Sequence, residues 1–207
     1  MIPNRKTRIP HLRSALDRGD SITVVGLGDS LTYGWMVGQG FFERFLLSLT
    51  AHWPDATIKG IAAGIPGDTA SGGLGRLDRV LDNHPHLVLV QFGLNDLFSG
   101  VDLASFEKSY QQITTDIVAA GPIPILVVSS PLPHSLEQDN ATRYYDVIRN
   151  LGQKLGVAVA DTDLHFRHSA EYRNDPDSLY LDDGSHPSDE GHRLMAEALT
   201  YLFMESL

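Results

Sequence analysis

The feature that most restricts the fold of this chain is an alternation of apolar runs with amphipathic stretches. Five runs are rich in β-branched or small apolar residues and nearly continuous, at residues 22–27, 57–62, 87–92, 125–129 and 157–160. Continuous rather than alternating apolar character is typical of strands covered on both faces, as in a parallel sheet. The runs therefore predict five parallel strands.

Stretches with apolar residues at helical spacing lie between and after these runs. They cover residues 41–51, 74–81, 103–119, 144–155 and 194–203. Alternation of strand and helix predicts an α/β fold, with a parallel sheet and helices on both of its faces. Residues 131–140 and 165–182 show neither pattern, so we expect two long surface loops there.

Length and composition are those of one globular domain. The chain has 207 residues, of which 42% are hydrophobic and 20% charged. Without an internal repeat or a linker that would divide it, we expect a single domain over residues 1–207. No stretch has the length of a membrane-spanning helix, and residues 1–18 lack the apolar run of a signal peptide. The expected location is the cytoplasm, by default.

Charge and residue usage exclude several classes of partner and site. The formal net charge of -10 argues against nucleic acid or an anionic membrane surface as the main partner. The absence of cysteine excludes a disulfide framework, a thiolate nucleophile and a thiolate metal site. The pairs His84 with His86 and His165 with His168 match no zinc or calcium motif, so we expect no metal site.

Four short polar segments lie at the ends of predicted strands or just before a helix. They are Gly-Asp-Ser-Leu at 28–31, Gly-Ile-Pro-Gly-Asp at 64–68, Gly-Leu-Asn-Asp at 93–96 and Asp-Gly-Ser-His-Pro at 183–187. In open parallel sheets, ligands bind outside the carboxyl ends of the strands, where three of these segments fall. Each alone is explained by a turn or a helix cap. Together they favour serine acyl-transfer chemistry.

Three residues are candidates for the catalytic relay. Ser30, in a glycine-flanked turn, is the candidate nucleophile, and His186 is the candidate base that would accept its proton. Asp183 lies three residues before His186, close enough for its carboxylate to orient the imidazole. Asp182 is a competing choice for that role.

Three groups are candidates for stabilising an oxyanion. They are the backbone N–H groups of Ser30 and Gly67 and the side-chain amide of Asn95. Gly67 lies in a glycine-rich turn after the second predicted strand, and Asn95 follows the third. Preorganised donors of this kind are worth about 3–4 kcal/mol each where measured.

Four apolar residues in loops or after strand ends have two possible roles. They are Trp35, Met36, Phe98 and Leu132. They would either line a pocket for the acyl group of a substrate or fill the core, and the sequence does not separate the two.

The four polar segments resemble the sequence blocks of the SGNH hydrolases, also called GDSL esterases and lipases. Their order and spacing, from residue 28 to residue 187, cover most of the chain. The resemblance implies a three-layer α/β/α sandwich with a five-stranded parallel sheet, of the flavodoxin-like type. It also implies ester hydrolysis through an acyl-enzyme, with no metal and no organic cofactor. Ala62 and Pro66 depart from the usual second block, and a proline donates no backbone hydrogen bond.

The resulting prediction is a serine esterase that cleaves carboxylic esters. Small soluble or short-chain esters are favoured, because no lid or amphipathic membrane helix is evident. The expected partner is therefore a small-molecule ester, with no nucleic acid and no stable membrane insertion. An acyltransferase, a carbohydrate O-deacetylase and a non-catalytic module that binds a glycan or a lipid remain as alternatives.

Overall fold

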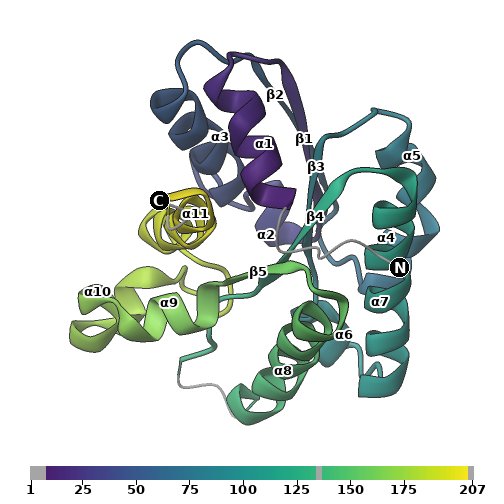
Figure 1. Cartoon of the computed structure of the whole chain (residues 1–207). Helices are drawn as coiled ribbons and strands as arrows, with labels where there is room; N and C mark the ends of the chain where they lie inside the picture. Colours follow the sequence, from purple (N-terminus) through teal and green to yellow (C-terminus); the bar gives the residue numbers. More distant parts are fainter. Residues whose placement is uncertain (1–7, 134–136, 205–207) are drawn as a thin grey trace.

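A computed structural model describes residues 8–133 and 137–204, and at its centre lies a sheet of five parallel strands (Figure 1). The strands are β1 (Ile22–Gly28), β2 (Ile58–Gly64), β3 (Leu87–Gln91), β4 (Ile123–Val128) and β5 (Ala158–Asp161). Their order is β2-β1-β3-β4-β5, which is the order of the flavodoxin-like doubly wound fold. Each strand lies within about two residues of its predicted run, so the predicted parallel sheet is confirmed.

Alternate residues of the strands pack into two cores on opposite faces of the sheet. Along β1, Ile22 and Val24 contribute to one core, whereas Val25 and Leu27 contribute to the other. The first core is covered by α1 (Arg8–Asp17), α3 (Phe41–His52) and α11 (Asp189–Met204). The second is covered by α4 (Ala70–Gly75), α5 (Leu77–Leu81), α7 (Leu103–Ala120) and α8 (Gln138–Leu155). Three layers result, as predicted.

The edge strand β2 differs from the central strands. Every residue of β3 is buried, whereas Lys59, Gly60 and Ala62 of β2 are exposed. A strand at the edge has a neighbour on one side only, so an apolar sequence does not by itself produce burial there. The expectation that all five runs are covered on both faces is therefore wrong for this strand.

The structure also corrects the prediction of a long loop at residues 165–182. That segment holds most of α9 (Thr162–His168), all of α10 (Ala170–Asn174) and a short 3-10 helix (Pro176–Leu179). The side chains of Asp161 and Ser169 cap the first two helices, because each accepts a hydrogen bond from a backbone N–H in the first turn.

Two further helices differ from the sequence prediction. The helix α8 begins at Gln138, inside the predicted loop 131–140, of which residues 134–136 lie outside the described residues. The helix α1 was not predicted, because its contribution to the core comes mainly from Leu12 and Leu16 in an otherwise polar and basic segment.

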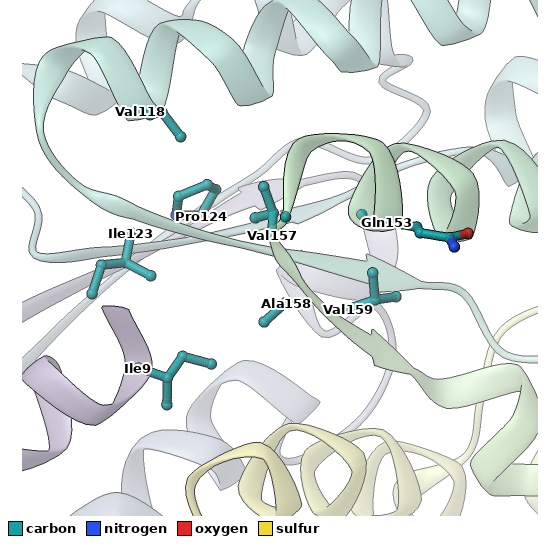
Figure 2. A pocket seen from close by; sticks show the side chains of 10 residues that line it. Ile9, Val118, Ile123, Pro124, Gln153, Val157, Ala158 and Val159 are labelled. Carbon is teal, nitrogen blue, oxygen red and sulfur yellow. The ribbon is translucent and has the colours of Figure 1, made fainter. Parts of the chain in front are cut away.

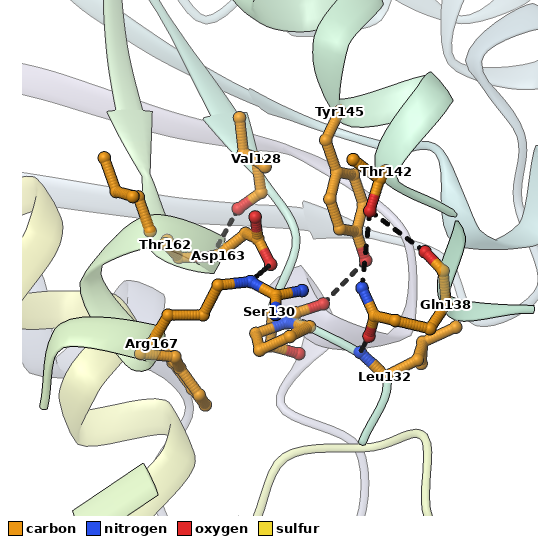
Figure 3. A network of polar contacts seen from close by, with 12 residues as sticks. Val128, Ser130, Leu132, Gln138, Thr142, Tyr145, Thr162, Asp163 and Arg167 are labelled. Carbon is orange, nitrogen blue, oxygen red and sulfur yellow. Dashed lines mark hydrogen bonds and ion pairs between the residues drawn. The ribbon is translucent and has the colours of Figure 1, made fainter. Parts of the chain in front are cut away.

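A polar network holds the chain where it leaves β4 (Figure 3). The hydroxyl of Tyr145, on α8, donates to the carbonyl of Ser130 at 2.6 Å. The hydroxyl of Tyr180 donates to the carbonyl of Pro131 at 2.7 Å. These two bonds tie the end of β4 to the second helical layer and to the chain segment that precedes residues 183–187.

An apolar cavity of about 470 Å³ lies at the opposite end of the sheet (Figure 2). It is bordered by Ile123 and Pro124 at the start of β4, by Val157 and Ala158 at β5, and by Ile9 of α1. Its lining holds no ionisable side chain. This cavity therefore offers no side chain for acid–base chemistry.

In the part of the chain that the structure describes, no helix combines the length and the apolar character needed to cross a bilayer. The same residues contain no group of three or more histidine, aspartate or glutamate side chains placed to hold a metal ion.

Candidate active site

The carboxyl ends of β1, β2 and β3 meet at one level of the sheet. Gly28 pairs in register with Gly64 of β2 and with Gln91 of β3. The three segments predicted to supply the nucleophile and the oxyanion donors follow these residues directly. The sheet thus brings all three segments to the edge where open α/β folds bind ligands.

Ser30 begins a one-turn helix, α2 (Ser30–Tyr33), directly after β1. Asp29 caps this helix, because its Oδ1 accepts a hydrogen bond from the Leu31 N–H at 3.0 Å. Glycine is needed at position 28, since a Cβ there would lie 2.1 Å from a side-chain oxygen of the same turn. This tight strand-to-helix turn fixes the backbone of the candidate nucleophile.

The three predicted relay residues form one hydrogen-bonded chain. Ser30 Oγ lies 2.9 Å from His186 Nε2, and His186 Nδ1 lies 2.7 Å from Asp183 Oδ2. With the proton of neutral His186 on Nδ1, that nitrogen donates to the carboxylate and Nε2 accepts from the serine hydroxyl. This is the geometry that general-base activation of a serine requires.

Asp183 is held by the loop that also carries His186. Its Oδ1 accepts hydrogen bonds from the backbone N–H groups of Ser185 at 2.9 Å and His186 at 2.8 Å. Partial burial raises the pKa of Asp183, but these bonds and the imidazole outweigh it and lower the pKa to about 2. The carboxylate is therefore ionised at neutral pH. Of the two competing aspartates, Asp183 is the one whose carboxylate bonds the imidazole ring.

The loop is anchored on both sides of the histidine. Tyr180 and Pro187 form an antiparallel bridge, and the Leu181 N–H donates to the His186 carbonyl at 2.8 Å. After the bridge, Ser188 Oγ accepts from the backbone N–H of Gly191 at 3.3 Å and caps α11. This cap fixes the loop to α11, whose apolar residues belong to the first core.

The turn after β2 carries Gly67 in a conformation that favours glycine. Its φ is 82°, and an added Cβ would meet no atom within 4 Å, so the position opens to solvent. The side-chain Nδ2 of Asn95 donates to the carbonyl of Asp68 at 3.0 Å, which ties α6 (Leu94–Phe98) to this turn. A side-chain amide carries two N–H groups, so Asn95 keeps one for another acceptor.

A buried polar network that the sequence did not predict lies behind the nucleophile. Gln91 Nε2 donates to Asp29 Oδ2 at 3.3 Å and to Ser129 Oγ at 3.1 Å, and its Oε1 accepts from Thr32 at 2.9 Å. Asp29 is fully buried, and this burial raises its pKa to about 7. A carboxyl that titrates near neutral pH thus directly precedes the candidate nucleophile.

Arg76 is a second feature that the sequence did not predict. It lies between α4 and α5 and donates to the carbonyls of Gly28 at 2.9 Å and Ala63 at 2.6 Å. Its Nε also donates to Asp68 Oδ2 at 2.9 Å. One guanidinium therefore joins the ends of β1 and β2 to the turn of Gly67. A single arginine between helices gives no sequence signal of this role.

The four apolar candidates separate into two groups. Leu132 is 1% exposed and belongs to the core, which excludes it from an open pocket. Trp35, Met36 and Phe98 are 39%, 77% and 54% exposed, and they follow the carboxyl ends of β1 and β3. These three are therefore surface residues on the segments that follow Ser30 and Asn95, and not part of the core.

Comparison with known proteins identifies the family of this chain. Residues 27–194 match the model of the GDSL-like Lipase/Acylhydrolase family. An arylesterase of Vibrio mimicus is 29% identical over 175 residues, which cover 83% of this chain and 82% of the relative. Thioesterase 1/protease 1/lysophospholipase L1 of Escherichia coli strain K12 is 30% identical over 176 residues, which cover 84% of this chain and 80% of the relative.

Solved structures show the same fold. The acetylxylan esterase Axe2 of Geobacillus stearothermophilus has a TM-score of 0.79 at 20% identity, over 89% of this chain and 95% of that one. A lipase/acylhydrolase of Enterococcus faecalis has a TM-score of 0.75 at 23% identity, over 87% of this chain and 94% of that one. The family match spans all four polar segments and confirms the resemblance seen in the sequence. The chain belongs to the GDSL-like lipase/acylhydrolase family, hydrolases that act on ester bonds.

Proposed function

We propose that this chain hydrolyses carboxylic esters through an acyl-enzyme in which Ser30 is the nucleophile. The observation that carries the proposal is the hydrogen-bonded chain from Ser30 Oγ through His186 to Asp183, with distances of 2.9 Å and 2.7 Å. A free serine hydroxyl is a weak nucleophile, and a base within hydrogen-bond reach activates it.

In the acylation step, Ser30 Oγ attacks the ester carbonyl carbon while His186 Nε2 takes the hydroxyl proton. The carbonyl oxygen becomes an oxyanion, which accepts hydrogen bonds from the N–H groups of Ser30 and Gly67 and from Asn95 Nδ2. The tetrahedral intermediate then expels the alcohol, to which His186 returns the proton. Ser30 is left as an ester of the acid.

Deacylation repeats these steps with water in place of the serine. His186 takes a proton from water, the resulting hydroxide attacks the acyl carbon, and Ser30 leaves with the proton that His186 gives back. Asp183 stabilises the imidazolium that forms in both halves. Its pKa of about 2 supports this role, because it keeps the carboxylate charged at neutral pH.

Small or short-chain esters are the substrates that we favour. Trp35, Met36 and Phe98 are exposed on the segments that follow Ser30 and Asn95, and they would offer apolar contact to a compact acyl or aryl group. Thioesters are a second candidate substrate class, since attack at the acyl carbon is the same and a relative 30% identical is named a thioesterase. An acyltransferase is a variant of the same chemistry, and product analysis with added alcohols separates it from a hydrolase.

Residues 1–207 act as one hydrolase domain, the partner is a small ester rather than nucleic acid or a membrane, and the location is the cytoplasm. The chemistry uses no metal, so activity should be unaffected by EDTA.

The experiment is hydrolysis of p-nitrophenyl esters from acetate to palmitate, in EDTA, by wild type, Ser30→Ala and Ser99→Ala. Ser99 is an exposed serine after α6 and serves as a matched control. We expect turnover by wild type and Ser99→Ala, with rates highest on short chains, and a loss of about 10⁴-fold or more in Ser30→Ala. A folded Ser30→Ala protein that turns over at the wild-type rate would sink the proposal.

A further inference from the structure

Arg76 is connected to all three proposed oxyanion donors through residues that lie beside them or bond them. It donates at 2.9 Å to the carbonyl of Gly28, which lies two positions before Ser30. It also donates at 2.9 Å to Oδ2 of Asp68, which directly follows Gly67. The carbonyl of that same Asp68 accepts from Asn95 Nδ2 at 3.0 Å, so the third donor is connected through it.

The contact between Arg76 and Asp68 is partly buried, and every nitrogen of the guanidinium and both oxygens of the carboxylate form a hydrogen bond. The two side chains are 15% and 14% exposed, so solvent screens their attraction less than on an open surface. Asp68 Oδ1 accepts from the backbone N–H of Thr69 at 2.9 Å, while Oδ2 accepts from Arg76. All three guanidinium nitrogens donate, in directions that the planar fork of arginine fixes and that a lysine ammonium does not reproduce.

β1 and β2 are paired up to Gly28 and Gly64, and the Ile65 N–H donates to the Gly28 carbonyl at 3.0 Å. Beyond these bonds, the Gly67 turn points to solvent with no neighbour where a Cβ would lie. Oxyanion donors contribute most when they are already aligned before charge develops on the substrate. A fixed connection between the strand ends and the exposed turn supplies that alignment.

We propose that Arg76 and Asp68 are a positioning pair that aligns the three oxyanion donors, without touching the substrate. The proposal rests on the proposed serine mechanism, because it assigns the pair to the transition state of that reaction. Loss of the pair should therefore lower kcat and weaken the binding of tetrahedral analogues, while leaving KM nearly unchanged.

The expected loss is partial. Asp96 on α6 also accepts from the backbone N–H of Ala70 through both carboxylate oxygens, at 3.1 Å, so a second connection remains between α6 and the start of α4, which follows the turn. Removal of a whole oxyanion donor costs about 10²–10³ in kcat, and a misplaced one costs less. We expect a fall in kcat of about 10–100-fold.

Arg149 offers a matched control. Its guanidinium bonds Asp146, Asp161 and Asp163 at 2.7–2.9 Å, and its side chain is 27% exposed. It joins α8 to the end of β5, three strands away from β1 in the sheet. Arg149→Met thus removes a comparably bonded arginine without touching the oxyanion side.

The test compares Arg76→Met, Arg76→Lys, Asp68→Asn and Arg149→Met with wild type. kcat and KM are measured on p-nitrophenyl butyrate, with the active sites counted by a fluorophosphonate label so that unfolded protein is not included. The affinity of a trifluoromethyl ketone, which forms a tetrahedral adduct, is measured beside the thermal midpoint. Asp68→Asn and Arg76→Lys keep the test decisive if Arg76→Met does not fold.

The expected result is that kcat per labelled site falls about 10–100-fold in the Arg76 and Asp68 variants, with KM within about threefold of wild type. The affinity for the ketone should fall by the same factor as kcat/KM. Arg149→Met should lose thermal stability but keep kcat. Wild-type kcat in the folded Arg76 and Asp68 variants, or a rise in KM alone, would overturn the proposal. Activity retained in Ser30→Ala would instead overturn the serine mechanism on which it rests.

Discussion

The two halves of the candidate site are built in different ways. Asp29 and Ser30 are 0% and 6% exposed, and they follow a central strand of the sheet. The side chains of His186 and Asp183 are 25% and 43% exposed, and they lie on a short loop before α11. The nucleophile half depends on contacts between segments far apart in the sequence, whereas the acid–base half depends on a turn of a few residues.

The difference follows from what each half has to do. The nucleophile half holds donors for a charge that exists only in the transition state, so it benefits from burial and rigid neighbours. The acid–base half exchanges protons with the leaving alcohol and then with water, so His186 has to be reachable from solvent. Substitutions should therefore act on chemistry in both halves, but on stability mainly in the buried one.

The largest expected effect comes from breaking the hydrogen-bonded chain of Ser30, His186 and Asp183. His186→Ala should lower kcat/KM on p-nitrophenyl acetate by about 10⁴-fold or more, because Ser30 then lacks a base. The double variant with Ser30→Ala should lose little beyond either single variant, since the two residues act as one unit. Additive losses in the double variant would show that Ser30 and His186 act separately.

The next effect separates the two aspartates of the loop. Asp183→Asn removes the charge that stabilises the imidazolium and should cost about 10³-fold in kcat, whereas Asp182→Asn should change it less than about threefold. Steady-state rates of the two variants, at equal thermal midpoints, measure the contrast. A larger loss in Asp182→Asn than in Asp183→Asn would show that Asp182, and not Asp183, orients His186.

A third prediction concerns the buried half of the site and the dependence of folding stability on pH. Asp29 has a pKa of about 7 in the folded chain, against an ordinary value of 3.8 for an aspartate side chain in water. Between these values the folded state holds a proton that the unfolded state lacks, so stability falls as pH rises from about 4 to about 7. The contribution is up to about 4 kcal/mol across that window.

Denaturant unfolding between pH 4 and pH 8 measures this effect. Asp96, whose pKa burial raises to about 6, acts in the same direction, so the wild-type slope includes both groups. Asp29→Asn should flatten the slope without abolishing it. The cost of placing an amide against Gln91 should appear equally at every pH. An unchanged slope in this variant would mean that Asp29 is charged in the folded protein.

The smallest effect tests the apolar surface beside the site. Met36→Ser and Phe98→Ser should lower kcat/KM on p-nitrophenyl butyrate, relative to acetate, by about 3–10-fold, because a few methylene groups lose apolar contact. Tyr201→Ser and Leu47→Ser remove residues that are 51% and 56% exposed on α11 and α3, and they serve as controls. Equal butyrate-to-acetate ratios of kcat/KM in all four variants would show that Met36 and Phe98 do not bind the substrate.

The sequence predicts the sheet well because its signal is local. Each buried strand is a continuous apolar run, and each long helix carries apolar residues at regular spacing, so every such element is evident within its own residues. The helices α1, α9 and α10 lack this pattern. Their apolar contacts are few, as with Leu12 and Leu16 in α1 or Phe166 in α9, and their caps are single polar side chains.

The candidate site was likewise predictable where its contacts are local in the sequence, and less so where they are not. Asp183 and His186 lie three residues apart and could be paired from the sequence, although the choice over Asp182 needed the structure. The contact of Ser30 with His186 spans 156 residues and was predicted only through the order of the polar segments and the family resemblance. Arg76 was missed because two of its acceptors are backbone carbonyls, which have no sequence signature, on strands that meet only in the fold.

The central claim is that Ser30 carries the acyl group, and trapping that intermediate tests it most directly. Wild type and Ser30→Ala are mixed with p-nitrophenyl butyrate and quenched in acid within milliseconds. The proteins are then digested, and the masses of the peptides are measured by mass spectrometry. The account predicts a butyryl adduct on the peptide that contains Ser30 in wild type, and none in Ser30→Ala. A butyryl adduct on another residue would contradict it. Turnover by wild type would also contradict it if Ser30 carried neither a butyryl group nor, after labelling, a fluorophosphonate.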